Sequence, residues 1–164
     1  MEVAQNTCDR GGAHCMPDKT IQMEYSWRYS SHCPYNWMVN DLWRGVQAEQ
    51  NYLVALGLFT YSEALGRMIL RTTGKRGRGW KAFREFTEQY VGYSFSNWQE
   101  VYDNFRNGLA HSYWIKDVGA VWDEDGSAPC GIDASGSVRA VRMRSYFMHF
   151  VEGLERALTA GVLK

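Results

Sequence analysis

One short stretch of the chain, RNGLAHSY, brings together four side chains that are suited to phosphate chemistry: Arg106, Asn107, His111 and Tyr113. A guanidinium group binds a phosphodiester and stabilises negative charge that develops during its cleavage. A histidine titrates near neutrality, so it can act as a general acid or base. Two interpretations compete: a site that cuts RNA, and a set of polar groups that stabilise an interface or a helix end.

These residues fall on a predicted helix that begins near Asn97 and runs to about Ile115. At about 100° per residue, one face of this helix is apolar and consists of Val101, Tyr102, Phe105 and Leu109. A separate polar cluster consists of Asn104, Asn107 and His111. On a regular helix Arg106 and His111 are about 140° apart. They can meet one phosphate only if Arg106 curls round, the helix deforms, or a second subunit completes the site, and we favour the second subunit.

The stretch resembles the motif of the HEPN superfamily, the higher-eukaryote and prokaryote nucleotide-binding domains. That motif is Arg, a polar residue, three residues, His, one residue and Tyr, and its spacing here is similar to that in the toxins of HEPN and minimal-nucleotidyltransferase pairs. The resemblance covers residues 40 to 160, loosely outside the motif. It implies a metal-independent endoribonuclease that needs no cofactor and works as a homodimer, with two motif helices facing each other across a cleft.

The resemblance also implies a role for each motif residue. His111 would act as general acid or base on the ribose 2′-hydroxyl or the leaving oxygen, Arg106 would hold the scissile phosphate, and Asn107 would orient the phosphate or the imidazole. In the toxin branch, a partner nucleotidyltransferase modifies the matching tyrosine with AMP, so Tyr113 is a candidate regulatory site. The alternative is a non-catalytic HEPN-like module that binds RNA, a nucleotide or a protein partner.

A second feature relevant to RNA is a run of cations with no acidic residue between them: Arg67, Arg71, Lys75, Arg76, Arg78, Lys81 and Arg84. The glycines in GKRGRG let this segment follow a phosphate backbone. We predict that Lys75, Arg76 and Arg78 bind RNA, and the alternative is a solvated, flexible loop. Glu63 lies on an otherwise apolar helix, and we expect it to pair with Arg67 one turn later. The alternative is that Glu63 contributes to the active-site cleft.

Hydrophobic periodicity predicts the elements that hold these groups. A helical pattern begins at Asp41, and its apolar face consists of Val54, Leu58, Tyr61, Leu65 and Met68. A second helix is predicted over Trp80 to Val91, with Phe83, Phe86 and Tyr90 turned inward. Two overlapping capping-box spacings, Ser96 with Gln99 and Asn97 with Glu100, begin the third helix.

The segment after the third helix changes character, because Gly, Ser and Asp separate the short apolar runs AVW and VRAVRM. This pattern predicts a small β-hairpin or meander. A last helix is predicted from about Arg144 to Ala160, with a buried stripe of Phe147, Phe150, Val151, Leu154 and Leu158. The predicted fold class is therefore mainly α, an HEPN-like helical bundle with a small β-hairpin before its last helix.

The first 35 residues have no helical stripe, so we predict an irregular N-terminal arm over 1–35 and a helical domain over 36–164.

The 18 basic and 18 acidic residues give a formal net charge of zero, so no overall charge draws the protein to nucleic acid or to a membrane. No apolar run approaches the roughly 18 residues of a membrane span, and no secretory signal is recognisable, so a cytoplasmic protein without membrane contact is expected. Three of the four cysteines lie in the arm. They suggest either free thiols, which we favour, or a metal clip from Cys8, His14, Cys15, His32 and Cys33.

Overall fold

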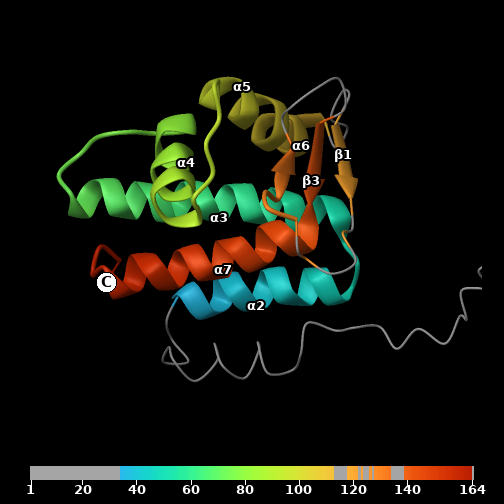
Figure 1. Ribbon diagram of the computed structural model, residues 1–164, viewed down its shortest axis with the longest axis horizontal. Helices are drawn as coiled ribbons and strands as arrows, with labels where there is room; N and C mark the ends of the chain where they lie inside the picture. Colours follow the sequence, from blue (N-terminus) through green and yellow to red (C-terminus); the bar gives the residue numbers. More distant parts are fainter. Residues whose placement is uncertain are drawn as a thin grey trace, which may run out of the picture.

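The computed structural model describes residues 34–112, 118–121, 123, 126, 128–133 and 139–163. In these ranges the chain is mainly helical and has a small sheet before its last helix (Figure 1). The predicted mainly α class with a β-hairpin before the last helix is confirmed at this level. Residues 1–33 of the predicted arm lie outside the described residues, and with them the cysteines and histidines of the suggested metal clip.

The first two described helices, α2 (Pro34–Gln47) and α3 (Asn51–Thr72), run in opposite directions along the bundle (Figure 1). A proline suits the first position of a helix because its φ angle is already fixed near the helical value. The helical pattern therefore begins before Asp41, so the predicted start at Asp41 was wrong. A turn at residues 48–50 separates α2 from α3, with Glu49 in the left-handed region at φ 52°.

Helix α3 is the central helix of the bundle. Its 22 residues include a window with mean hydropathy 1.4, which is long and apolar enough for a membrane span, contrary to the expectation from apolar runs alone. More than half of that window, 56%, is buried inside the fold. Leu58, Phe59 and Leu65 are completely covered by other elements. A core helix of a globular bundle passes the same test of length and composition.

Helix α4 (Trp80–Phe86) crosses α3, and the π-helical turn η1 (Thr87–Val91) continues it. The predicted helix over 80–91 is confirmed, with Phe83 and Phe86 buried. The two helices touch at Gly66, where a methyl group would lie 1.8 Å from the carbonyl oxygen of Ala82. Glycine is therefore required at this crossing, because any other side chain would push α4 away from α3.

The predicted third helix consists of α5 (Trp98–Tyr102), the π-helical turn η2 (Asp103–Asn107) and α6 (Gly108–Ser112). Of the two capping spacings, the one at Asn97 is used: its Oδ1 accepts from the Glu100 amide at 3.1 Å, and its Nδ2 donates to the Glu100 carboxylate at 3.2 Å. Phe105 stacks on Phe59 with ring centroids 5.4 Å apart, which fixes η2 on α3. Residues 113–117 lie outside the described residues.

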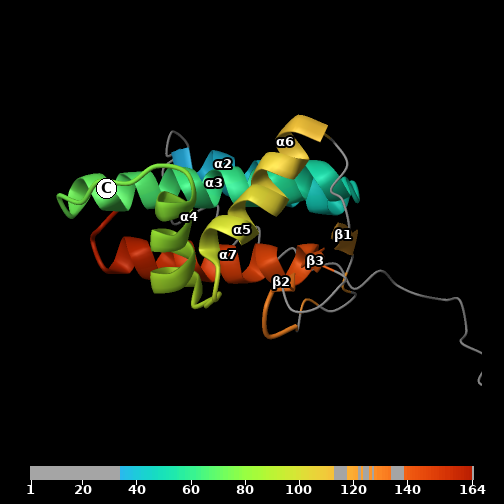
Figure 2. The ribbon, with the colours of Figure 1, turned by 90° about the horizontal axis from the view of Figure 1, so that it is seen from above.

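A small sheet and helix α7 (Met143–Thr159) complete the fold. Strands β1 (Val118–Val121), β2 (Ile132–Asp133) and β3 (Arg139–Arg142) lie in the order β1-β3-β2. The pair β2–β3 is the predicted hairpin, whereas the parallel pairing of β1 with β3 was not predicted. Seen from above, the sheet lies near the start of α7 (Figure 2).

The start and the buried face of α7 both follow from named side chains. Asp123 caps the helix, since its carboxylate accepts the amide hydrogens of Arg144 at 2.9 Å and Ser145 at 3.0 Å. The predicted stripe is confirmed for four buried residues, Phe147, Phe150, Val151 and Leu154, while Leu158 is partly buried.

Candidate functional site

A buried carboxylate links the central helix to the motif helix. Glu63 of α3 lies among apolar residues and is only 3% exposed, so its carboxylate is shielded from water. Tyr102 donates a hydrogen bond from its hydroxyl to Oε2 of Glu63 at 2.6 Å. Nε of Arg106 lies 3.4 Å from the same oxygen, and Arg67 binds Oε1. The predicted pair of Glu63 with Arg67 is confirmed, and Tyr102 and Arg106 are additional partners.

The Tyr102 hydroxyl is part of this cluster rather than only of the apolar core. Burial, together with its hydrogen bond to Glu63, raises the pKa of Tyr102 to about 12, because a phenolate there would be poorly solvated and would face a carboxylate. Sequence periodicity placed the ring of Tyr102 correctly on the apolar face. It did not predict that the Tyr102 hydroxyl binds Glu63. The sequence signal for this contact was Glu63 itself, because a single carboxylate on an apolar helix needs polar partners.

Arg106 is anchored at one end of its guanidinium group. Its Nε is buried and forms an ion pair with Glu63 rather than a hydrogen bond. The side chain as a whole is 27% exposed. Arg106 therefore lies at the border between the core and the surface, and it is oriented by a buried group.

The motif helix is not a regular α-helix at Arg106. In η2 the amide of Gly108 donates to the carbonyl of Asp103, five residues earlier. Each residue of this wider turn advances by a smaller angle than in an α-helix, so Arg106 and His111 are separated by less than the 140° of a regular helix. Deformation of the helix, one of the three alternatives, is therefore present. A second subunit is therefore less strongly required to bring these two residues to one phosphate.

The remaining motif residues are Asn107, His111 and Tyr113. Nδ2 of Asn107 donates to Oδ1 of Asp103 at 2.7 Å, so this amide is bound within its own helix. The backbone of His111 belongs to α6, but its side chain lies outside the described part of the structure. Tyr113 lies outside it altogether. The meeting of Arg106 with His111 stays a prediction.

The predicted cation run divides into paired and unpaired residues. Lys75 donates to Glu85 at 3.0 Å, and Arg84 binds Glu88 with a shortest distance of 2.8 Å. In contrast, three exposed arginines have no ion pair among the described residues: Arg71, Arg76 and Arg78. The absence of acidic residues from the run in sequence therefore did not mean that all seven cations are free.

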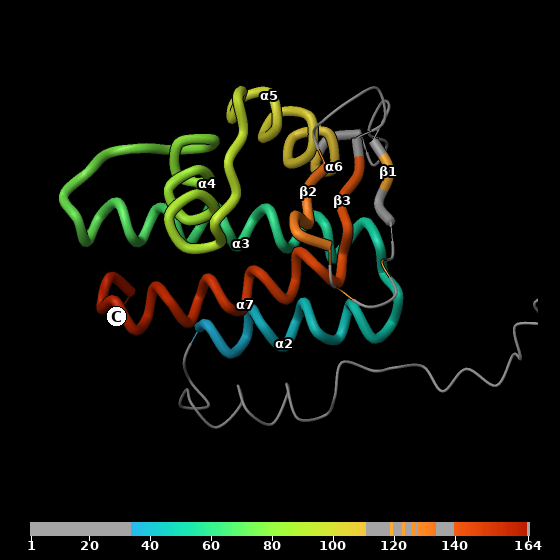
Figure 3. Tube along the Cα trace, in the orientation of Figure 1, coloured from blue at the N-terminus to red at the C-terminus, as the bar shows by residue number. Residues whose placement is uncertain are grey.

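The loop between α3 and α4 lies at the far end of α3 and returns to the start of α4, next to α5 (Figure 3). At Gly77 a methyl group would lie 2.8 Å from Cδ1 of Leu70, so the loop packs on the last turns of α3. Gly79 has a positive φ of 56°, and a methyl group there would lie 3.7 Å from the ring of Tyr102. Trp80 is half-buried with the Lys81 ammonium 5.6 Å from its ring centroid.

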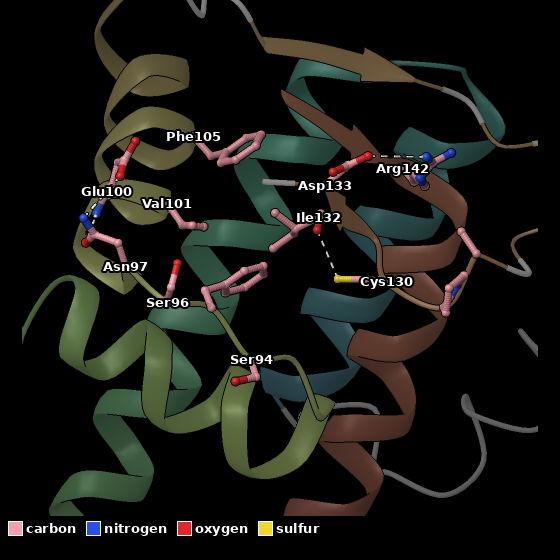
Figure 4. Close-up of a pocket in the computed structure, with 13 residues that line it drawn as sticks. Ser94, Ser96, Asn97, Glu100, Val101, Phe105, Cys130, Ile132, Asp133 and Arg142 are labelled. Carbon is pink, nitrogen blue, oxygen red and sulfur yellow. Dashed lines mark hydrogen bonds and ion pairs between the residues drawn. The ribbon is translucent and has the colours of Figure 1, made fainter. Parts of the chain in front are cut away.

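A cavity of about 660 Å³ lies on the side of the motif helix that carries Val101 and Phe105 (Figure 4). It separates the loop before α5 from the β2–β3 hairpin, and Arg142 and Asp133 form an ion pair at 3.7 Å on its wall. Neither Arg106 nor Asn107 lines it. The lining residues are Ser94, Phe95, Ser96, Asn97, Glu100, Val101, Phe105, Ala128, Pro129, Cys130, Ile132, Asp133 and Arg142.

Two further reactive side chains have structural roles. The Cys130 thiol donates to the carbonyl of Ile132 at 3.0 Å, and burial raises its pKa, so it is protonated near neutrality and a poor nucleophile. Nδ1 of His149 lies 2.7 Å from the Tyr93 hydroxyl, which accepts the Gly131 amide at 2.7 Å. Burial lowers the pKa of His149. This network ties α7 to the loops around it.

Within the described ranges, no group of three His, Cys, Asp or Glu side chains is arranged to hold a metal ion. No protein-family model, curated protein or solved structure matches the chain. The resemblance to the HEPN superfamily therefore rests on the sequence motif.

Proposed function

We propose that the protein is a metal-independent endoribonuclease of the HEPN type, with Arg106, Asn107 and His111 as its site. The observation that carries this proposal is the contact of Arg106 with the buried Glu63 at a π-helical turn of the motif helix. Removing a carboxylate from water costs several kcal/mol. Glu63 is buried beside Arg106 in spite of this cost, and its contact fixes the orientation of the arginine.

The anchoring suits a phosphate-binding role. Because the buried Nε faces Glu63, the guanidinium group is restricted to few orientations, and the exposed part of the side chain remains available to an anion. Pre-oriented donors stabilise developing charge better than mobile ones. Single π-helical turns within α-helices also occur frequently at functional sites.

In the proposed reaction His111 removes the proton of a ribose 2′-hydroxyl, whose oxygen attacks the adjacent phosphorus. The bond from phosphorus to the 5′-oxygen breaks, and the leaving oxygen takes a proton from an acid. Arg106 stabilises the charge on the phosphate oxygens, and Asn107 orients the phosphate or the imidazole. The products are a 2′,3′-cyclic phosphate and a 5′-hydroxyl. A homodimer would supply a second His111 as the acid.

The same proposal includes regulation and location. AMP transfer to Tyr113 by a nucleotidyltransferase antitoxin would place a bulky anion two residues after His111 and block the site. An enzyme of this kind, acting on cellular RNA, would work in the cytoplasm.

A second candidate function is a non-catalytic module that binds RNA, a nucleotide or a protein. It is favoured by one observation: Arg106 and Asn107 already have partners inside the chain, Glu63 and Asp103. In that case the motif stabilises the helix and its contact with α3.

Incubation of total RNA with the purified protein and a chelator separates these candidates. The nuclease predicts cleavage by the wild type and by Gln99→Ala, a change at an exposed position of the same helix, but none by His111→Ala. If the wild type retains RNA without cleaving it, the binding module is favoured and the nuclease is excluded.

A further inference from the structure

We propose that Arg71, Arg76 and Arg78 form, together with Arg106, a binding track for successive phosphates of a single RNA strand beyond the cleaved bond. We refer to the first three as the arginine track. The inference rests on the proposed role of Arg106, and it adds where the rest of the substrate lies.

A chain of contacts places the end of the loop beside the motif arginine. A methyl group at Gly79 would lie 3.8 Å from the Tyr102 hydroxyl, which is 2.6 Å from Oε2 of Glu63. That same oxygen is 3.4 Å from Nε of Arg106. Arg78 directly precedes Gly79. The loop therefore leads away from the cluster that holds Arg106 (Figure 3).

Helix α3 leads in the same direction. Glu63, Arg67 and Arg71 are spaced four residues apart, so they lie on one side of α3 with a rise of about 6 Å per step. Arg67 is bound to Glu63, and the next cation along the helix is the exposed Arg71. Arg71 lies in the last turn of α3, just before the loop that carries Arg76 and Arg78.

Ion pairing distinguishes the arginine track from the neighbouring Lys75 and Arg84. Within the described chain, the three arginines have no carboxylate partner, whereas Lys75 is bound to Glu85 and Arg84 to Glu88. Glu85 holds the single ammonium group of Lys75, and Glu88 holds Arg84 at both Nε and Nη2, so these two cations attract a phosphate less strongly. Arg106 contacts Glu63 through Nε alone, and the exposed part of its side chain remains available to a phosphate. The track therefore includes Arg71 and excludes Lys75, which changes the set predicted from sequence.

The composition of the loop indicates which ligand it suits. Residues 71–79, RTTGKRGRG, contain no Asn, Gln, Asp, Glu or aromatic residue. The segment thus lacks aromatic rings that stack on bases and the amide and carboxylate groups that read base edges, and its cations bind phosphates irrespective of sequence. All three arginines belong to one short segment, residues 71–78, which suits the backbone of one strand rather than the two backbones of a duplex.

Binding of an uncleavable strand tests the track apart from catalysis. The probe is a fully 2′-O-methylated RNA of about 12 nucleotides, a length within the range bound by single-strand modules. With Arg71, Arg76 and Arg78 all changed to Gln, affinity should fall at least about tenfold, and the slope of log affinity against log salt should decrease by about 2.

The matched control removes the same charge elsewhere, with Arg44, Arg84 and Arg156 changed to Gln. This control should keep the affinity within about twofold, because Arg84 and Arg156 are already paired with Glu88 and Glu152, and Arg44 lies on α2. An equal loss in both triple variants would show a general charge effect and overturn the track. Unchanged affinity in the track variant would overturn it too, as would equally tight binding of a duplex of the same length.

Cleavage of a dinucleotide keeps the two proposals distinguishable. The track lies beyond the cleaved bond, so the track variant should cleave a dinucleotide at the wild-type rate. If the wild type cleaves no RNA and yet the track variant loses affinity for the 2′-O-methylated strand, then the nuclease is wrong and the track stands. If the variant loses dinucleotide cleavage while it remains folded, then the arginines belong to the catalytic site and the track is wrong.

Discussion

Nε of Arg106 lies 3.4 Å from Oε2 of the buried Glu63, so the arginine of the motif is positioned by a carboxylate on a different helix. Tyr102 donates to the same oxygen from one turn before Arg106. The motif helix is thus attached to the central helix α3 by polar contacts in addition to its apolar face. The orientation of Arg106 and the stability of the bundle depend on the same group.

Replacement of Glu63 by Gln should destabilise the fold. The change keeps the shape of the side chain but leaves two guanidinium groups without a buried negative partner, so we expect the free energy of unfolding to fall by about 2 kcal/mol. Urea unfolding monitored by circular dichroism measures it. Glu152→Gln, in the exposed pair with Arg156, is the control and should cost less than about 1 kcal/mol. Equal effects would show that Glu63 is not a special partner.

The raised pKa of Tyr102 predicts a loss of stability in alkaline solution. A group whose pKa is higher in the folded state binds its proton more tightly there, and this contribution is complete below the unfolded value of 10.0. It is lost as the pH rises toward about 12. The difference in unfolding free energy between wild type and Tyr102→Phe should therefore shrink over this window. A difference that is constant or grows with pH would contradict the hydrogen bond to Glu63.

The crossing of α3 and α4 depends on Gly66. A Cβ there would lie 1.8 Å from a backbone oxygen that cannot rotate away, so Gly66→Ala should cost about 3 kcal/mol or more. Gly74→Ala is the comparison, because nothing lies within 4 Å of its Cβ position and only its φ of 73° opposes the change. That variant should lose about 1 kcal/mol. In thermal unfolding we expect a lower midpoint temperature for Gly66→Ala than for Gly74→Ala. Similar midpoints would contradict the close approach of α3 and α4.

Arg106→Ala should abolish most of the cleavage activity. Removal of one charge-stabilising donor commonly lowers a rate by about a hundredfold or more, and Arg106→Lys should restore only part of it because an ammonium lacks the forked geometry. Arg156→Ala, in an exposed pair on α7, controls for the loss of an arginine and should leave the rate unchanged. If Arg106→Ala loses stability but keeps its rate, the arginine is structural.

Several elements could be predicted from sequence because burial imposes a period on them. The helix over 80–91 and the stripe of α7 from Phe147 to Leu154 follow this rule. The capping residue Asn97 was predictable because its partner Glu100 lies three positions later. In each of these cases the deciding contacts are local or come from one apolar face.

Other features depend on contacts between distant segments. The turn between α2 and α3 contains no Gly or Pro, so nothing local marked it. The π-helical turn at Arg106 shifts hydrogen bonds by one residue without a sequence signature, and it invalidates an angle calculated for a regular helix. The parallel pairing of β1 with β3 and the convergence of Tyr102 and Arg106 on Glu63 are set by the fold as a whole.

The most direct test of the central claim is mass analysis of products from a defined RNA oligonucleotide, incubated in EDTA with the wild type and with His111→Ala. We expect fragments ending in a 2′,3′-cyclic phosphate and a 5′-hydroxyl with the wild type only. The same oligonucleotide with a 2′-deoxyribose at the cut position should stay intact, since the attacking hydroxyl is gone. Cleavage that persists in His111→Ala, or an intact oligonucleotide with the folded wild type, would contradict the assignment of Arg106 and His111 as a ribonuclease site.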